Sequence, residues 1–168
     1  HLFVVSAEGG AARQLTRGPG NASAGIEAIP KGAIDWLPDG KTILFDGLPG
    51  TPDDLLYRQS HLYSVDVVSA EVRQLTTEPG FWTTPVASSD GQRIAYLGHP
   101  PSRASYVMPR VYVMNSDGSG ARRLSETFDR PPSTGLFWAA DGGSLYFIST
   151  RSSVGIKRKD LDIWRIDR

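Results

Sequence analysis

The sequence predicts an all-β chain built from repeated sheets of four antiparallel strands. One repeated phrase occurs as HLFVVSAEGGAARQLT, HLYSVDVVSAEVRQLT and RVYVMNSDGSGARRLS, and a second as IDWLPDGKTILFDG, PVASSDGQRIAYLG and LFWAADGGSLYFIS. Each phrase has two short apolar runs around a tight turn, which is the pattern of a β-hairpin. The chain also has 18 Gly and 12 Pro and lacks long helical periodicity, which favours strands and turns throughout.

The spacing of the second phrase identifies the architecture. Its Asp-Gly pairs begin at Asp39, Asp90 and Asp141, and this period of about 51 residues is typical of propellers and solenoids. One period holds two hairpins, and four short antiparallel strands per repeat describe one β-propeller blade. Propellers close with about four to eight blades, whereas this chain carries about three blades' worth of strands. We therefore expect a partial propeller, cut mid-blade at both ends, that is a fragment of a larger protein.

The blades follow one another along the chain. Residues 1–16 supply the end of one blade, so the chain starts mid-blade. Residues 33–76 form a full blade, with strands expected at 33–36, 41–46, 61–67 and 71–75. Residues 85–125 form the next full blade, with strands expected at 85–87, 93–97, 110–114 and 121–124. Residues 136–168 form an incomplete blade that stops before its fourth strand.

Large aromatic residues recur at equivalent repeat positions. Trp36 and Trp138 occupy the same place in the first strand of their blades, and Trp164 aligns with Tyr63 and Tyr112 in the third strand. Aromatic side chains ordinarily fill the interface between repeats. We therefore expect these residues to pack between blades.

Composition excludes several classes of partner. The formal net charge is zero, from 18 basic and 18 acidic residues, so no strong field favours nucleic acid or an anionic membrane. Cysteine is absent, so neither disulfides nor thiolate metal sites can hold the fold, and the redox compartment stays open. No apolar run approaches the roughly 20 residues of a membrane helix. We expect no nucleic-acid partner and no membrane partner.

We expect no catalytic residue and no bound metal or cofactor. A nucleophile elbow needs Gly-x-Ser-x-Gly on a strand-to-helix turn, and the chain has no such pentapeptide. Ser119, in SDGSG, fits a hairpin turn. His1 and His61 share one repeat position, which favours a structural role, and His99 is interpreted as a loop residue. The three His are scattered, and the NSDG run lacks the distal Glu of a calcium loop.

The long connections are expected on one face of the blades. The first-to-second and third-to-fourth turns of each blade are tight, whereas the connections on the other face are long: 17–32, 48–60, 77–84, 99–109 and 150–160. Binding groups concentrate on long loops of a rigid scaffold. We therefore place the substrate or partner face there, with eleven candidate residues: Asp53, Asp54, Tyr57, Arg58, Phe81, Trp82, Arg103, Tyr106, Arg130, Lys157 and Arg158.

The chemistry of these candidates suits recognition. Arg mixed with aromatic residues resembles interface composition, and an Arg can hold a peptide carboxylate in a bidentate pair. Phe81 and Trp82 stand in TEPGFWTTP, a connector outside the repeated phrases, so a role facing a ligand or another domain stays open for them beside an ordinary packing role. The run KRKD at 157–160 also fits a plain solvated loop.

Several phrases carry a family resemblance. WLPDGKTILF, LYSVDVVSAEVRQLT, VYVMNSDGSGARRLS and FDRPPSTGLFWAADGGSLYF resemble blades of the N-terminal propeller of prolyl oligopeptidase-family serine peptidases, especially the bacterial acylaminoacyl- and dipeptidyl-peptidase-like members. They are more distantly similar to TolB-like propeller repeats. The resemblance covers nearly the whole chain, and its peptidase branch depends on Asp129-Arg130 before a blade and on the long second-to-third strand loops. No glutamate pair of the dipeptidyl peptidases can be matched.

The peptidase resemblance implies a function for the parent protein. This chain would be a non-catalytic propeller segment of a serine peptidase, a hydrolase, that gates access and helps bind peptide substrates for a separate α/β-hydrolase domain. Its partners would be that missing domain, the remaining blades and the peptide, in the bacterial periplasm or cytoplasm. Two alternatives stay open: a TolB-like protein-binding propeller, and a shortened propeller that self-associates through open blade edges.

Overall fold

The computed structural model describes residues 1–17, 21–22, 34–48, 59–104, 107–124, 132, 135–150 and 161–167. Every element in this part of the chain is a β-strand, which confirms the all-β prediction. Among these residues, no helix has the length and hydropathy needed to cross a membrane.

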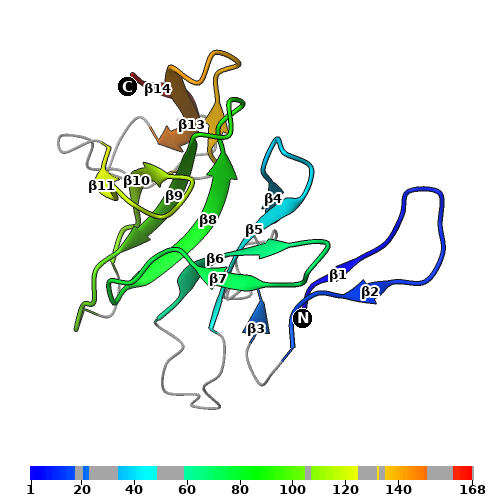
Figure 1. Ribbon diagram of the computed structural model, residues 1–168. Coiled ribbons are helices and arrows are strands. Elements are labelled where there is room, and N and C mark those ends of the chain that lie inside the picture. The colour runs from blue at the N-terminus through cyan, green and yellow to red at the C-terminus, as the bar shows by residue number, and fades with distance from the viewer. Residues whose placement is uncertain are drawn as a thin grey trace.

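The described strands form four antiparallel sheets, which we number as blades 1 to 4 in chain order (Figure 1). Blade 1 pairs β1 (Phe3–Val4) with β2 (Arg13–Gln14). Blade 3 has the order β11-β10-β9-β8, from β8 (Phe81–Ala87), β9 (Arg93–His99), β10 (Arg110–Asn115) and β11 (Arg122–Arg123). Blade 4 has the order β12-β13-β14, from β12 (Phe137–Trp138), β13 (Ser144–Thr150) and β14 (Leu161–Asp167).

Blade 2 has an irregular first strand. Its sheet runs from β5 (Thr42–Leu48) to β6 (His61–Asp66) and β7 (Val72–Gln74). Two short strands, β3 (Asn21–Ala22) and β4 (Ile34–Trp36), pair with the two ends of β5. The segment expected to be a plain connector therefore contains a strand. Blades 2 and 3 otherwise have the four-stranded meander predicted for a propeller blade.

The first strand of blade 3 starts earlier than predicted, at Phe81 instead of Pro85. Trp82 lies opposite Gly98 on β9, just as Ala22 lies opposite Gly47 on β5. Strands β3 and β4 of blade 2 together therefore correspond to the single strand β8. An irregularity in the β8–β9 register falls between Thr83 and Val86, and it lets β8 continue where blade 2 has a long insertion.

The Asp-Gly phrases form the tight turns predicted for them. In the first, the Asp39 carboxylate accepts hydrogen bonds from the backbone N–H groups of Lys41 and Thr42, at 2.8 and 2.9 Å. The following Gly40 has a φ of 66°, and its equivalents in blades 3 and 4 have φ values of 68° and 66°. Such positive φ angles favour glycine, which explains why each turn has the same dipeptide.

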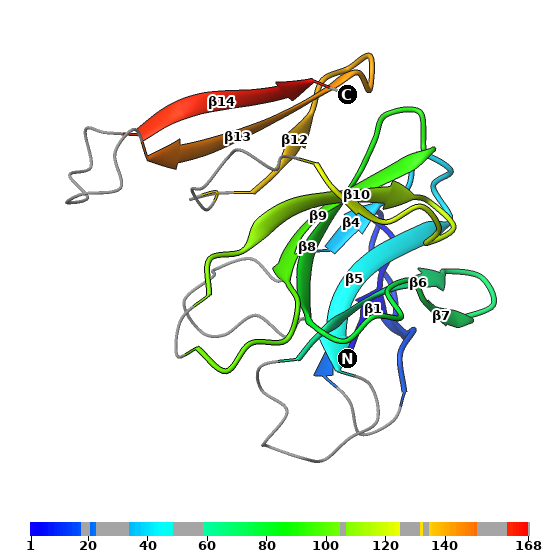
Figure 2. The ribbon, with the colours of Figure 1, turned by 90° about the vertical axis from the view of Figure 1, so that its left-hand side faces the viewer.

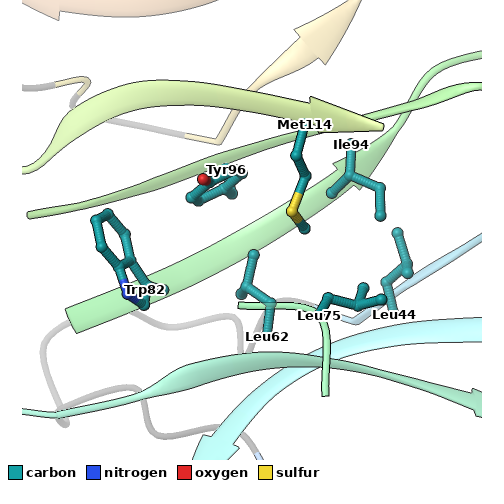
Figure 3. Packing of buried hydrophobic residues seen from close by; sticks show 7 residues of the cluster. All are labelled: Leu44, Leu62, Leu75, Trp82, Ile94, Tyr96 and Met114. Atoms are coloured by element: carbon teal, nitrogen blue, oxygen red, sulfur yellow. The ribbon is translucent and has the colours of Figure 1, made fainter. Parts of the chain in front are cut away.

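The blades stack face to face, and each interface holds one hydrophobic cluster. Between blades 2 and 3 the cluster consists of Leu44, Leu62, Leu75, Trp82, Ile94, Tyr96 and Met114, and Figure 3 shows these side chains between the ribbons of the two sheets. A second cluster joins blades 1 and 2 around Leu2, Phe45 and Tyr63. A third joins blades 3 and 4 around Leu97 and Phe147. This sequential packing is the arrangement of propeller blades.

The outermost faces of the stack are exposed. The β1–β2 hairpin and the β12–β14 sheet lie at opposite ends of the row of blades (Figures 1 and 2). Leu136 in blade 4 is 2% exposed against blade 3, whereas its repeat equivalent in blade 2, Ile34, is 49% exposed. Trp36 was expected to be a core residue and is 45% exposed. Among the described residues, blade 1 has only the β1–β2 hairpin, so it has no first and second strand to cover Trp36. Its equivalent Trp138 is half-buried against blade 3.

Candidate functional site

Three of the eleven predicted face residues lie in the described part of the chain. Arg103 is exposed, and Phe81 is half-buried, with its ring stacked on the ring of His99 at a centroid distance of 5.9 Å. His99 Nδ1 lies 2.7 Å from the carbonyl oxygen of Pro100. Phe81, His99 and Pro100 thus meet where β8 begins and β9 ends, at the base of the long connections. The other eight candidates lie outside the described residues: Asp53, Asp54, Tyr57, Arg58, Tyr106, Arg130, Lys157 and Arg158.

Trp82 belongs to strand β8 and not to a connector, and only 6% of its surface is exposed. Its indole packs edge-on against the rings of Tyr96 and Tyr112, at centroid distances of 5.8 and 5.1 Å. Its Nε1 donates a hydrogen bond to the carbonyl oxygen of Glu78 at 2.8 Å. The side chain is therefore part of the core between blades 2 and 3, and only its rim reaches the surface.

The polar side chains beside this core have structural partners. The hydroxyl of the buried Ser60 donates to the carbonyl oxygen of Trp82 at 2.7 Å. The Nδ1 atom of His61 lies 3.2 Å from Oγ1 of Thr76. The neighbouring Ser and His therefore bond to different residues and not to each other. Within the described ranges, no group of three or more His, Cys, Asp or Glu residues is placed to hold a metal ion.

A groove of about 370 Å³ opens between blades 2 and 3. Its floor is formed by Trp82, Tyr96 and Tyr112, and one wall continues along the connection that follows Leu75. The opposite wall is the β10–β11 turn, which packs closely on Leu75 at Gly118, where a Cβ would lie only 2.7 Å from the Leu75 carbonyl oxygen, and which carries the small side chain of Ala121. A concave, mainly apolar surface of this size falls in the range of small-ligand sites, about 300–1,000 Å³.

The groove floor is rigid and uncharged at neutral pH. The rings of Tyr96 and Tyr112 stack at 5.5 Å, in the same way as Phe45 and Tyr63 stack at 5.4 Å in blade 2. Burial, with a smaller contribution from Tyr112, raises the pKa of Tyr96 to about 12. The Tyr96 phenol therefore keeps its proton at neutral pH.

Sequence reasoning missed the groove, although a signal for it exists. Leu75-Thr76-Thr77-Glu78-Pro79-Gly80 repeats the form of Leu15-Thr16-Arg17-Gly18-Pro19-Gly20. Aligning these two runs places Trp82 on Ala22, in agreement with the strand register. The alignment would have located Trp82 at the start of the first strand of blade 3. It would also have marked Trp82 as the residue that distinguishes the blade 2–3 interface from the blade 1–2 interface.

Comparisons with known proteins agree on the fold. No protein-family model matches the sequence, and no curated protein matches it. Among solved structures, a protein from Agrobacterium tumefaciens assigned as TolB is 22% identical, with a TM-score of 0.65 over 98% of this chain and 52% of that chain. TolB from Acinetobacter baumannii is 17% identical, with a TM-score of 0.62 over 98% of this chain and 34% of that one.

A puromycin hydrolase is also similar, with 18% identity and a TM-score of 0.67 over 96% of this chain and 24% of that chain. The chain thus spans about half of the Agrobacterium TolB structure, about a third of the Acinetobacter one and about a quarter of the hydrolase. Together with the four stacked sheets, these matches show that the chain has the fold of consecutive β-propeller blades, as the sequence predicted.

Proposed function

We propose that this chain is a non-catalytic propeller segment of a serine peptidase, which gates access and helps bind peptides for a separate α/β-hydrolase domain. The observation that carries the proposal is the similarity to puromycin hydrolase, in which the matching propeller region makes up 24% of a hydrolase chain.

The gating role would be exerted by the face that carries the long connections. A rim of loops on rigid blades admits short or flexible chains and excludes folded ones, and it can bind the non-reacting end of a substrate so that the scissile bond is oriented. Arg103 supplies an exposed cation on this face, and Phe81 with His99 supplies a stacked aromatic pair at its base. The eight further candidates in the long connections would complete the face.

The exposed end faces of the stack support the presence of further blades in the parent protein. Phe137 and Ile163 in blade 4 are 59% and 76% exposed, and Phe3 in blade 1 is 58% exposed. Each blade of a propeller buries its faces only against its neighbours, so further blades would cover these side chains. The same exposed residues would drive self-association if the protein were a shortened propeller.

A TolB-like protein-binding propeller is the second candidate. It is favoured by the TM-scores of 0.65 and 0.62 with two TolB structures. In that case the face with the long connections would bind a protein partner, and no hydrolase domain would be attached.

The test is the intact mass of the native polypeptide that carries this sequence, together with its labelling by a fluorophosphonate probe. The peptidase proposal predicts a chain well above the 18.3 kDa of this segment with one labelled serine outside it. Labelling must disappear after heat denaturation, which controls for nonspecific reaction. A larger chain made of blades alone, without a labelled serine, would refute the peptidase role and favour the TolB-like candidate. A native chain of 18.3 kDa with a multimeric solution mass would favour self-association.

A further inference from the structure

The groove between blades 2 and 3 adjoins the face that carries the long loops, because two of the long connections supply part of its lining: Thr77, Glu78, Pro79, Pro100 and Pro101. The rest of the lining comes from Trp82 on β8, Tyr96 on β9 and Tyr112 on β10, from the residues directly after β7, and from the β10–β11 turn. We propose that this groove is a recognition site at the edge of that face, which binds a short extended peptide segment carrying proline beside a lysine or arginine. The proposal does not depend on whether the parent protein is a peptidase.

The first argument is that the binding surface is already formed. Trp82 is held edge-on against both tyrosines, and its Nε1 is fixed by the Glu78 carbonyl. Three rings locked in this way need no reordering when a ligand binds, so little side-chain entropy is lost. Aromatic-lined grooves of this kind recognise polyproline II segments, which are themselves stiff and lose little entropy on binding.

The second argument is that the groove is a property of this interface and not of the repeat. Blades 1 and 2 meet through an equivalent aromatic pair, Phe45 and Tyr63. The four positions that shape the groove are different there: Ala22 replaces Trp82, Gly18 replaces Glu78, Ser69 replaces Gly118 and Val72 replaces Ala121. The blade 2–3 interface therefore differs by a large aromatic residue, a carboxylate and, at Ala121, a smaller side chain on the facing turn, whereas Gly118 lets that turn pack closely on Leu75.

The third argument concerns the chemistry of the lining. Pro79, Pro100 and Pro101 contribute wall surface without any backbone N–H donor. Among the described residues that line the groove, Glu78 is the only charged one, and it is exposed. An apolar floor with one carboxylate at its rim complements a ligand that is apolar along its length and carries one cation. Acidic segments would place like charges together.

The experiment measures peptide binding to the full-length protein by fluorescence polarisation. The probe is fluorescein-labelled Ala-Pro-Pro-Lys-Pro-Ala, compared with the same peptide carrying Glu in place of Lys and with one carrying Ala in place of each Pro. The blocking variant is Ala121→Arg, because Ala121 is exposed and its new side chain would fill the groove and repel the lysine. The matched control is Ala12→Arg, at the equivalent exposed position of blade 1.

We expect wild type and Ala12→Arg to bind the probe equally, and Ala121→Arg to bind it at least about tenfold more weakly. Glu78→Gln should weaken binding of the lysine peptide by about two- to fivefold, the effect of one exposed ion pair. Both other peptides should bind more weakly than the probe. Thermal unfolding of each variant checks that the fold is intact, and Glu78→Lys provides a second blocking variant if Ala121→Arg does not fold.

Three outcomes would overturn the proposal. The first is no binding of the probe by wild type at millimolar concentration, and the second is unchanged binding by a folded Ala121→Arg or Glu78→Lys protein. The third is equal binding of the glutamate peptide and the lysine probe, which would contradict the argument that Glu78 selects a cationic ligand. The fluorophosphonate result has no bearing on any of these measurements, so this site and the peptidase role succeed or fail independently.

Discussion

A buried carboxylate ties blade 2 to blade 3, and its removal should destabilise the protein strongly. Asp46 is 1% exposed, and its Oδ2 atom accepts hydrogen bonds from the Thr83 hydroxyl and from the Thr84 N–H at 3.2 Å. These donors lie in the irregular part of β8, where Thr84 has a φ of 57°. A left-handed conformation costs a β-branched residue about 1–2 kcal/mol, so the carboxylate helps to hold a strained segment.

The expected loss follows from these contacts. A hydrogen bond to a charged group contributes about 1.5–3 kcal/mol, and Asp46→Ala leaves both donors without this acceptor. We expect Asp46→Ala to lower the free energy of unfolding by about 3–5 kcal/mol, and Asp46→Asn by about 1–3 kcal/mol because one carbonyl oxygen remains. A double-mutant cycle with Thr83→Val should give a coupling energy of about 1–2 kcal/mol.

The assay is urea denaturation of the full-length protein, with the m-value checked for constancy across variants. Asp39→Ala is the control, because the Asp39 carboxylate also accepts backbone hydrogen bonds but is exposed within a turn. We expect this substitution to lower the free energy of unfolding by about 1 kcal/mol or less. A loss below about 1 kcal/mol for Asp46→Ala, or strictly additive effects of Asp46→Asn and Thr83→Val, would refute the view that this carboxylate joins the blades.

Three further predictions concern other parts of the stack. Gly98→Ala should lower the free energy of unfolding by about 1–3 kcal/mol, because a Cβ there would lie 2.2 Å from the carbonyl oxygen of Phe81. The control is Gly135→Ala, whose Cβ meets open space, and it should change the free energy of unfolding by less than about 0.5 kcal/mol in the same urea assay. Hydrogen bonds from the backbone of Ser69 and Val68 lower the pKa of Asp66 from its ordinary 3.8, so its carboxylate stabilises the fold above that pH and loses the effect as pH falls through the lowered pKa. The stability gap between wild type and Asp66→Asn should therefore be full at pH 6 and shrink below about pH 4 in a denaturation series, and a gap that is the same at both ends contradicts this. Ile163→Arg should lower the Tm of the full-length protein by several degrees if another blade covers blade 4, and an unchanged Tm would show that this face is open.

Most of the fold was predictable because its signals are local. Alternating apolar runs and Asp-Gly turns fix hairpins through φ preferences and side-chain alternation, both of which act within a few residues. The strands expected near residues 61–67, 93–97 and 110–114 are found as β6, β9 and β10. The order of the hairpins then determines the blades.

The start of β8 was not predictable in the same way. Phe81 and Trp82 follow Pro79-Gly80, which reads as a turn, and the register of β8 against β9 shifts between Thr83 and Val86. A bulge of this kind interrupts the alternation from which a strand is recognised. The repeat signal was also hidden, because blade 2 has a long insertion between β3 and β4.

The groove could not be predicted from strand patterns alone. It depends on which side chains two neighbouring blades bring together, and on the small side chain at Ala121. The sequence shows that Tyr96 and Tyr112 lie on paired strands, but their stacking with Trp82 requires the corrected strand. The loop-face residues, by contrast, remain predictions except for the positions of Phe81, Trp82 and Arg103.

The hydrogen bonds between blades join positions about one repeat apart in the chain. Asp35 accepts from the N–H of Ala87, and the indole of Trp138 donates to the carbonyl of Val86, in both cases across 52 residues. The strands that form each interface are therefore joined by long-range contacts about one repeat apart, and we expect folding on the slower scale of all-β proteins, about milliseconds to seconds. During synthesis, each blade could dock on the preceding one soon after it leaves the ribosome, without waiting for distant parts of the chain.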